Sequence, residues 1–174
     1  DKYHDLATAS DKTILSTTGR GYYVLGIVGG KDEPSNHALR DIAAMKAELE
    51  ANGMPMIVLF PDEAAAKGCA LTEGLPSTAS LGVDPNGEIR KEIAENMRLS
   101  NHSLPIFIIA DTFNRVVFVS EGYSIGLGRQ LLDTAANLSP TYTHRKSAPR
   151  HPGKHLGAPY FAQKPASEPT NTAN

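Results

Sequence analysis

One short stretch of the chain holds residue types that act together in several kinds of enzyme. Ser35, His37 and Asp41 lie close together, and the four-residue spacing of His37 and Asp41 places both on one face of a helix. With Asp32 and Glu33 they form a polar cluster that could serve as a hydrolase relay or a metal site. The simpler interpretation is a helix start, where acids favour the helix dipole and polar side chains cap the first turn. Because no second histidine at ligand spacing and no Gly-x-Ser-x-Gly motif supports the enzyme, we favour the helix start and expect no metal.

The single cysteine, Cys69, is a second candidate for chemistry. One cysteine excludes an internal disulfide, a Cys-x-x-Cys pair and a cysteine-rich zinc site. A lone cysteine is more often a small buried apolar side chain than a nucleophile. A cysteine hydrolase needs a cysteine, a histidine and an acid in this chain order, which Cys69, His102 and Asp111 provide. However, His102 falls in a predicted loop and Asp111 suits a hairpin turn. We therefore keep Cys69 as an alternative, as the thiol of a monothiol oxidoreductase or peroxidase.

Composition excludes several classes of protein. The chain has 174 residues, of which 40% are hydrophobic and 21% charged, and this suits one globular domain with its own core. No segment approaches 18 uninterrupted apolar residues, so we expect no membrane span. The formal net charge of −2 argues against a dedicated nucleic-acid binder. The chain begins at Asp1 without an initiator methionine, and we expect a processed protein or a piece of a longer one.

Residues 140–174 differ from the rest. They contain six of the 12 prolines and five basic residues against one acid, whereas residues 1–139 carry a net charge of −6. Such a segment buries too little apolar surface to offset the entropy lost on ordering. We expect a flexible, basic, proline-rich tail that can lie on its own acidic body or on an acidic partner.

The body alternates strand and helix signals. Residues 22–28 and 56–60 are short apolar runs typical of buried strands. Between them an apolar residue recurs every three or four positions, which predicts a helix that is capped at Ser35 or Asn36 and ends at Gly53. The residues of this stripe are Ala38, Ile42, Met45 and Leu49.

The second half of the body contains the clearest hairpin. Apolar runs at 106–110 and 116–119 flank a loop at 111–115. A helix is expected from about Leu127. Between the two halves we expect a short helix at 62–67, a turn at 84–87, and either a helix or a short strand at 89–99. The resulting order is β-α-β, a connection, then β-β-α.

This order, with a proline opening the third strand, resembles the thioredoxin-like fold over residues 14–138. Residues 104–107, Leu-Pro-Ile-Phe, look like the cis-proline segment of that fold, so we predict a cis peptide between Leu104 and Pro105. The resemblance implies an α/β domain with a central mixed sheet flanked by helices. We accordingly divide the chain into a lead-in at 1–13, the thioredoxin-like domain at 14–139 and the tail at 140–174.

Three segments point to a narrower resemblance. Residues 33–38, 116–123 and 126–128 are similar to the thioredoxin-like domain at the C-terminal end of large bacterial extracytoplasmic proteins, frequent in Bacteroidetes, that contain a transglutaminase-like domain. This resemblance implies a location in the periplasm or at the cell surface, and a catalytic domain that precedes the present chain.

The chain departs from thioredoxin-like enzymes at the position that decides their chemistry. Those enzymes carry Cys-x-Pro-Cys after the first buried strand, where the helix N-terminus lowers the pKa of the attacking thiol. The corresponding residues here are Asp-Glu-Pro-Ser, with Asp32 and Ser35 at the two sulfur positions. A carboxylate is merely stabilised as an anion there, and a serine hydroxyl cannot form a disulfide. Dithiol exchange is therefore impossible, and a peroxidase of the peroxiredoxin type would also need a cysteine near this point.

A binding surface remains. In thioredoxin-like proteins the cis-proline segment and the first-helix loop form a groove for an extended peptide, and such binding needs no sulfur. The residues expected to line it are Asp32, Glu33, Pro34, Ser35, His37, Leu104, Pro105 and Tyr123. We predict a redox-inactive interaction or scaffolding domain for a protein or peptide partner, without a cofactor.

Overall fold

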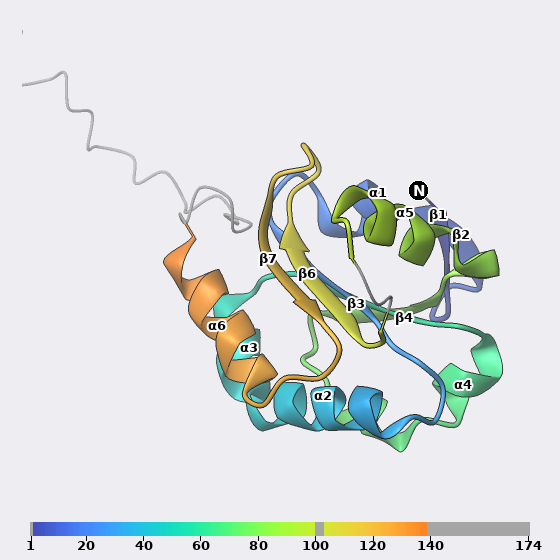
Figure 1. The fold of residues 1–174 in the computed structure, drawn as a ribbon, viewed down its shortest axis with the longest axis horizontal. Helices are drawn as coiled ribbons and strands as arrows, with labels where there is room; N and C mark the ends of the chain where they lie inside the picture. The colour runs from blue at the N-terminus through green and yellow to red at the C-terminus, as the bar shows by residue number, and fades with distance from the viewer. Residues whose placement is uncertain (1, 100–102, 139–174) are drawn as a thin grey trace, which may run out of the picture.

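A seven-stranded mixed β-sheet forms the centre of the protein (Figure 1). The computed structural model describes residues 2–99 and 103–138. The strands lie in the order β2-β1-β5-β4-β3-β6-β7 across the sheet. Their bounds are β1 Lys2–Asp5, β2 Ser10–Thr13, β3 Tyr23–Ile27, β4 Met56–Phe60, β5 Ala79–Val83, β6 Ile106–Ala110 and β7 Val116–Glu121.

The three inner strands β3, β4 and β6 are buried along their whole length. β4 runs parallel to β3 and to β5, whereas β6 runs antiparallel to both β3 and β7. Strands covered on both faces read as continuous apolar runs, which is why these segments stand out in the sequence.

Helices cover both faces of the sheet. Figure 1 shows α2, α3 and α6 on one side and α1 and α5 on the other. None of the helices in the described residues is long and apolar enough to cross a membrane. The helix bounds are α1 Ile14–Thr18, α2 Glu33–Ala44, α3 Lys46–Asn52, α4 Glu63–Lys67, α5 Glu88–Asn96 and α6 Leu127–Asn137, with short 3₁₀ helices η1 Ala70–Gly74 and η2 Pro85–Gly87.

The alternation of side chains along the strands divides the core into two clusters. Val24 of β3 packs in the cluster under α2 and α6, while its neighbour Leu25 packs in the cluster under α5. Ile42 of α2 and Leu131 of α6 belong to the first cluster, and Ile93 of α5 belongs to the second. The sheet thus separates two apolar layers, each with its own helices.

The closest helix contact joins α2 and α6. Gly128 lies so near the backbone of α2 that a Cβ atom at this position would overlap the carbonyl of Asp41. A glycine here lets the two helix backbones approach, and the pair covers one face of the sheet.

Most of the expected elements are confirmed. Strands at 22–28 and 56–60, the hairpin, the short helix after Asp62 and the last helix from Leu127 all form, and residues 89–96 are helical. The cap prediction for the long helix is wrong, because Asp32 rather than Ser35 or Asn36 caps it. That helix is also divided in two at Met45, and Gly53, with a left-handed φ of 79°, ends the second part.

Three strands were not expected from the sequence. β1 and β2 form an N-terminal hairpin within residues 1–13, the segment predicted as a lead-in. The third strand is β5, which pairs with β1.

Asp5 of the N-terminal hairpin is buried, accepts two hydrogen bonds from Thr8 and lies 3.3 Å from the Lys12 ammonium. Burial opposes its ionisation, but these contacts outweigh burial and hold the pKa of Asp5 below its ordinary value. The tail at 140–174 lies outside the described residues.

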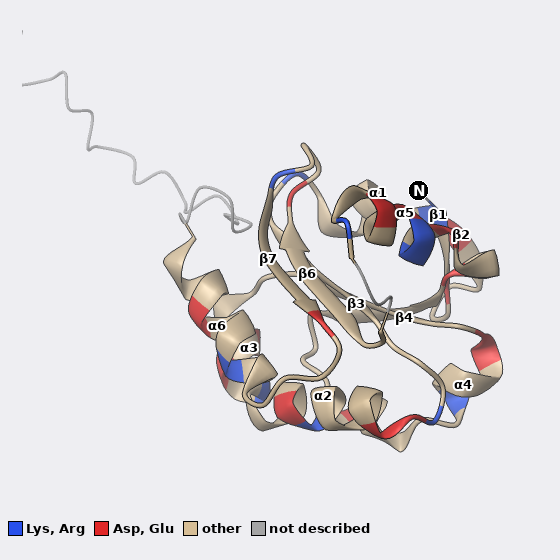
Figure 2. Cartoon of the chain, viewed as in Figure 1, with Lys and Arg blue, Asp and Glu red and all other residues tan. Residues whose placement is uncertain are grey.

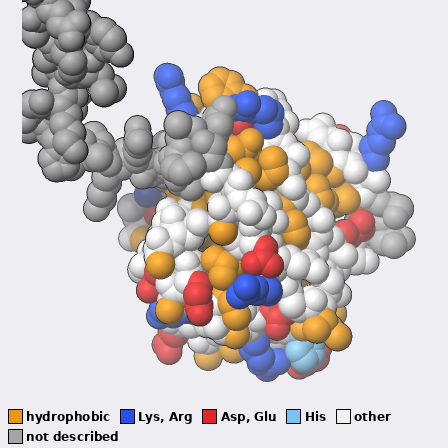
Figure 3. All heavy atoms as spheres, turned by 90° about the vertical axis from the view of Figure 1, so that its left-hand side faces the viewer, with side chains coloured by type: hydrophobic (Ala, Val, Ile, Leu, Met, Phe, Trp, Pro, Cys, Tyr) orange, Lys and Arg blue, Asp and Glu red, His pale blue; other side chains and the backbone are white. Residues whose placement is uncertain are grey.

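The outer strand β7 leaves apolar side chains on the surface. Val117 and Val119 are 42% and 43% exposed. Figure 3, seen from the side of β7 and α6, shows hydrophobic side chains in several groups between charged ones.

Replacement of Gly128 by alanine tests how closely α6 packs on α2. Alanine favours a helix over glycine by about 1 kcal/mol, but its methyl group would overlap the Asp41 carbonyl. We expect a net loss of about 1–3 kcal/mol in the free energy of unfolding, because overpacking forces the helices apart. Urea unfolding followed by circular dichroism measures this loss. Gln130→Ala, at an exposed position of the same helix, should change stability by less than about 0.5 kcal/mol. A Gly128→Ala protein as stable as the wild type would contradict the close contact.

Candidate functional site

The turn between β3 and α2 is held by side-chain hydrogen bonds. The carboxylate of Asp32 accepts from the backbone N–H of Ser35 at 2.8 Å and so caps α2. The hydroxyl of Ser35 is buried and accepts from the backbone N–H of Gly29 at 2.9 Å. Pro34 occupies the first turn of α2. A backbone N–H at this position has no partner within the helix, so the absence of one in proline loses no hydrogen bond. The two oxygen side chains at the expected sulfur positions therefore stabilise the local backbone.

An exposed surface follows on α2. The imidazole of His37 stacks on the ring of Tyr123, with ring centroids 5.2 Å apart. The same imidazole lies 3.7 Å from the carboxylate of Glu33, which is also 3.9 Å from the guanidinium of Arg40. Acidic residues mark the chain at the start of α2 in Figure 2. We call Glu33, His37 and Tyr123 the α2 surface.

Asp41 connects α2 to the start of α6. Its carboxylate accepts from the Tyr123 hydroxyl at 3.2 Å and from the backbone N–H groups of Gly126 and Leu127 at 3.1 and 3.2 Å. It thereby caps α6 from another helix, at the positive end of the helix dipole. Loss of hydration at the phenol, the negative charge of Asp41 and the hydrogen bond to it all raise the pKa of Tyr123.

The peptide bond between Leu104 and Pro105 is cis, as the sequence predicts. Pro105 is buried and Leu104 is half-buried. The carbonyl of Pro105 accepts from the backbone N–H of Gly122 at 2.8 Å. Since Gly122 precedes Tyr123, this bond joins the cis-proline segment to the α2 surface. The structure thus links Glu33, His37 and Tyr123 to Pro105 through one run of contacts.

The proposed relay of Ser35, His37 and Asp41 is not assembled. The Ser35 hydroxyl is engaged by Gly29, His37 contacts Tyr123 and Glu33, and the Asp41 carboxylate caps α6. Across residues 2–99 and 103–138, no group of three histidine, cysteine or acidic side chains could hold a metal ion.

Cys69 lies in the apolar core. It follows α4, is 9% exposed and belongs to the cluster under α2 and α6. Asp111 lines a pocket on the opposite face of the sheet, so Cys69 and Asp111 do not meet. His102, the third member of the order considered from the sequence, lies outside the described residues.

The capping role of Asp41 is the feature that sequence reasoning missed. The spacing places Asp41 on the same helix face as His37, whereas the structure directs its carboxylate to residues 82 to 86 positions further along the chain. An acid ahead of a helix in sequence signals a cap, but Gly126 stands there instead. No local pattern could have indicated a cap supplied by α2.

Comparisons with known proteins identify the fold. No protein-family model and no curated protein matches the chain. The thioredoxin domain of a thiol-disulfide oxidoreductase from Bacteroides vulgatus has 12% identity and a TM-score of 0.58, with 78% of this chain and 92% of that one covered. The exposed lipoprotein thioredoxin of Streptococcus pneumoniae has 14% identity and a TM-score of 0.53, with 79% of this chain and 98% of that one covered. Peroxiredoxin 5 of Alvinella pompejana has 16% identity and a TM-score of 0.58, with 79% of this chain and 92% of that one covered.

The chain therefore has a thioredoxin-like fold, with the mixed central sheet and flanking helices expected from its sequence. Identities of 12–16% show the shared fold alone.

Substitution of Asp41 tests the joint between α2 and α6. Asp41→Asn removes the charge that three donors share, and we expect a loss of about 1–2 kcal/mol in the free energy of unfolding. Tyr123→Phe removes one of the three donors and keeps the ring on His37, so its loss should be smaller. Urea unfolding of both proteins gives these values.

The same variants predict a titration. In Asp41→Asn the pKa of Tyr123 should fall towards its ordinary value, because the negative charge beside the phenol is gone. Ultraviolet absorbance of the tyrosinate, with Tyr123→Phe subtracted to isolate this residue, follows the change. An unchanged Tyr123 titration in Asp41→Asn would show that the hydrogen bond does not form in solution.

Proposed function

We propose that this thioredoxin-like domain binds a protein or an extended peptide and does not exchange disulfides. The observation that carries the proposal is the start of α2, where Asp32 and Ser35 hold the turn by hydrogen bonds and provide no sulfur. In the enzymes that this segment resembles, the thiolate at this point is the attacking group.

The oxygen side chains do not provide a substitute reaction. A serine needs a general base within hydrogen-bond reach, and the Ser35 hydroxyl is instead buried against Gly29. The neighbouring imidazole of His37 contacts Glu33 and Tyr123. Asp32 caps α2, and its carboxylate accepts a hydrogen bond from the backbone of that helix.

The α2 surface and the cis-proline segment supply the binding face. An extended peptide can add backbone hydrogen bonds at Leu104, while the stacked rings of His37 and Tyr123 offer a flat surface for its side chains. The bond between Gly122 and Pro105 holds the two parts in one arrangement, which lowers the entropic cost of binding.

We further propose that the domain works outside the cytoplasm as part of a larger bacterial protein. The likeness in fold to the exposed lipoprotein thioredoxin supports this location. The resemblance of residues 33–38, 116–123 and 126–128 to domains that accompany a transglutaminase-like domain supports the larger assembly. An upstream domain of that assembly is the partner we favour.

Insulin reduction by dithiothreitol tests the absence of disulfide exchange. The wild-type protein should leave the rate at background, because no sulfur stands at the start of α2. The double variant Asp32→Cys/Ser35→Cys should accelerate the reaction, since it places two thiols at this helix N-terminus beside the cis-proline segment.

A matched control is available at α4. Asp62 caps that helix by accepting from the backbone N–H of Ala65, in the same way that Asp32 engages Ser35. Asp62→Cys/Ala65→Cys therefore creates an equally spaced pair at another helix start and should show much less activity. Insulin reduction above background by the wild-type protein would contradict the proposal.

Alkylation of Cys69 tests the alternative of a monothiol enzyme. Because the thiol is buried among apolar side chains, iodoacetamide should react with the native protein at least about tenfold more slowly than with the protein unfolded in guanidinium. Cys69→Ala/Ala70→Cys moves the thiol to an exposed neighbouring position and gives the rate of an accessible thiol. Fast native reaction at pH 6 would instead favour the oxidoreductase or peroxidase.

A further inference from the structure

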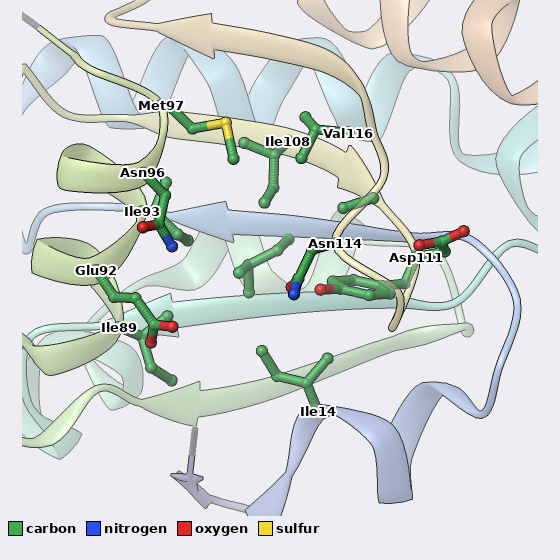
Figure 4. Close-up of a pocket in the computed structure, with 13 residues that line it drawn as sticks. Ile14, Ile89, Glu92, Ile93, Asn96, Met97, Ile108, Asp111, Asn114 and Val116 are labelled. Atoms are coloured by element: carbon green, nitrogen blue, oxygen red, sulfur yellow. The ribbon is translucent and has the colours of Figure 1, made fainter.

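A pocket of about 360 Å³ opens on the α5 face of the sheet (Figure 4). Its floor is formed by Leu25 and Ile108 of the sheet, and its walls by Ile89 and Ile93 of α5 and by Ile14 at the start of α1. The volume lies at the lower end of the range for small-molecule sites, which suits a ligand with one ring.

The pocket is separate from the binding face proposed above. Tyr23, at the first position of β3, lines it and pairs with Ala110 at the last position of β6. Asp32 follows the other end of β3, and the five residues of this strand span about 13 Å at the usual rise. The inference therefore does not depend on the proposed function.

Polar groups converge on this apolar space. Figure 4 shows the side chains of Glu92 and Asn96, which project from α5, and of Asn114, which comes from the β6–β7 loop, directed towards the same opening. Two amides and one carboxylate above an apolar floor are the arrangement expected of a site that orients a ligand.

The charges of the lining are of one sign. Among the described residues that line the pocket, Glu92 and Asp111 are acidic and none is a lysine, arginine or histidine. The Asp111 carboxylate is engaged in its own hairpin, by the backbone N–H of Phe113 at 2.9 Å and by the Nε of Arg115 at 2.7 Å. Within the described chain, no cation forms an ion pair with Glu92, so its carboxylate is the group left to meet a ligand.

The buried phenol of Tyr23 reports the same negative environment. Burial raises its pKa first, and the charges of Asp111 and Glu92 raise it further. An anionic ligand would be repelled by the Glu92 carboxylate, whereas a cation would be attracted to it.

We propose that this pocket binds a small primary amine that carries an aromatic ring. The ring would occupy the space between Ile93 and Ile108, beside the thioether of Met97, which favours aromatic contacts. The ammonium would meet the carboxylate of Glu92 at the opening, and the amide oxygens of Asn96 and Asn114 would accept its remaining N–H donors. A rigid ring loses less conformational freedom on binding than an alkyl chain of the same area.

Titration with 2-phenylethylamine, followed by ¹H–¹⁵N correlation spectra of the full chain, tests this site. Saturable shifts are expected in α5 and in residues 108–116, and none of comparable size at the start of α2. Phenylacetate, which has the same ring and the opposite charge, should bind at least about tenfold more weakly, because it meets Glu92 with like charge.

Two variants on α5 isolate the charge. Glu92→Gln should weaken phenylethylamine binding by up to about fivefold, as expected for an ion pair of an exposed carboxylate. Glu88→Gln, one turn earlier on the same helix and outside the pocket lining, should leave the affinity unchanged. Equal binding of amine and acid, or equal affinities of these two variants, would overturn the charge assignment.

A blocking variant locates the ligand. Asn96 is exposed at the end of α5, so Asn96→Phe is compatible with the fold and places a ring at the opening. Amine binding should then be lost while the dispersion of the spectrum is retained. Saturable binding that persists in Asn96→Phe, or the absence of saturable shifts in the wild type, would overturn the site.

Discussion

The hydrogen bond from the Gly29 amide to the Ser35 hydroxyl is the constraint on which the start of α2 depends. It ties the turn after β3 to the first turn of the helix, and the Asp32 cap closes the same turn from the other side. A Cβ atom at Gly29 would overlap the Asp32 carboxylate, so a side chain at this position would displace the group that caps α2. A frame that resembles the site of thiol chemistry is thus held together by oxygen groups, which can order the backbone but cannot carry out disulfide exchange.

A second run of contacts extends this frame across the molecule. Asp41 caps α6 and holds the Tyr123 hydroxyl, Tyr123 stacks on His37, and Gly122 bonds to the carbonyl of Pro105. Each bond contributes about 1 kcal/mol, and bonds that share an acceptor are not additive. Their joint effect is positional, since two helices and the cis-proline segment are kept in one arrangement.

The sheet separates two surfaces of different character. On the side of α2 and α6, the helices meet closely at Gly128 and leave a flat, polar surface around Tyr123. On the opposite side, a pocket remains between α5, the start of α1 and the buried side chains of β3 and β6. Tyr23 and its partner Ala110 line the pocket, whereas Ile27 and Ile106, at the other ends of the same strands, lead to Asp32 and Pro105.

Neighbouring residues were enough to predict the buried strands, the hairpin, the last helix and the cis peptide at Pro105, because apolar periodicity and turn chemistry are local properties of the chain. They did not reveal β1, β2 or β5, whose segments are short and carry few of the apolar residues that mark a buried strand. The sequence by itself determined that this chain cannot form an internal disulfide, because it has a single cysteine. Tertiary structure alone decided that Asp41 caps α6 and that Glu92, Asn96 and Asn114 face one pocket, since contacts between distant segments depend on how the helices pack on the sheet.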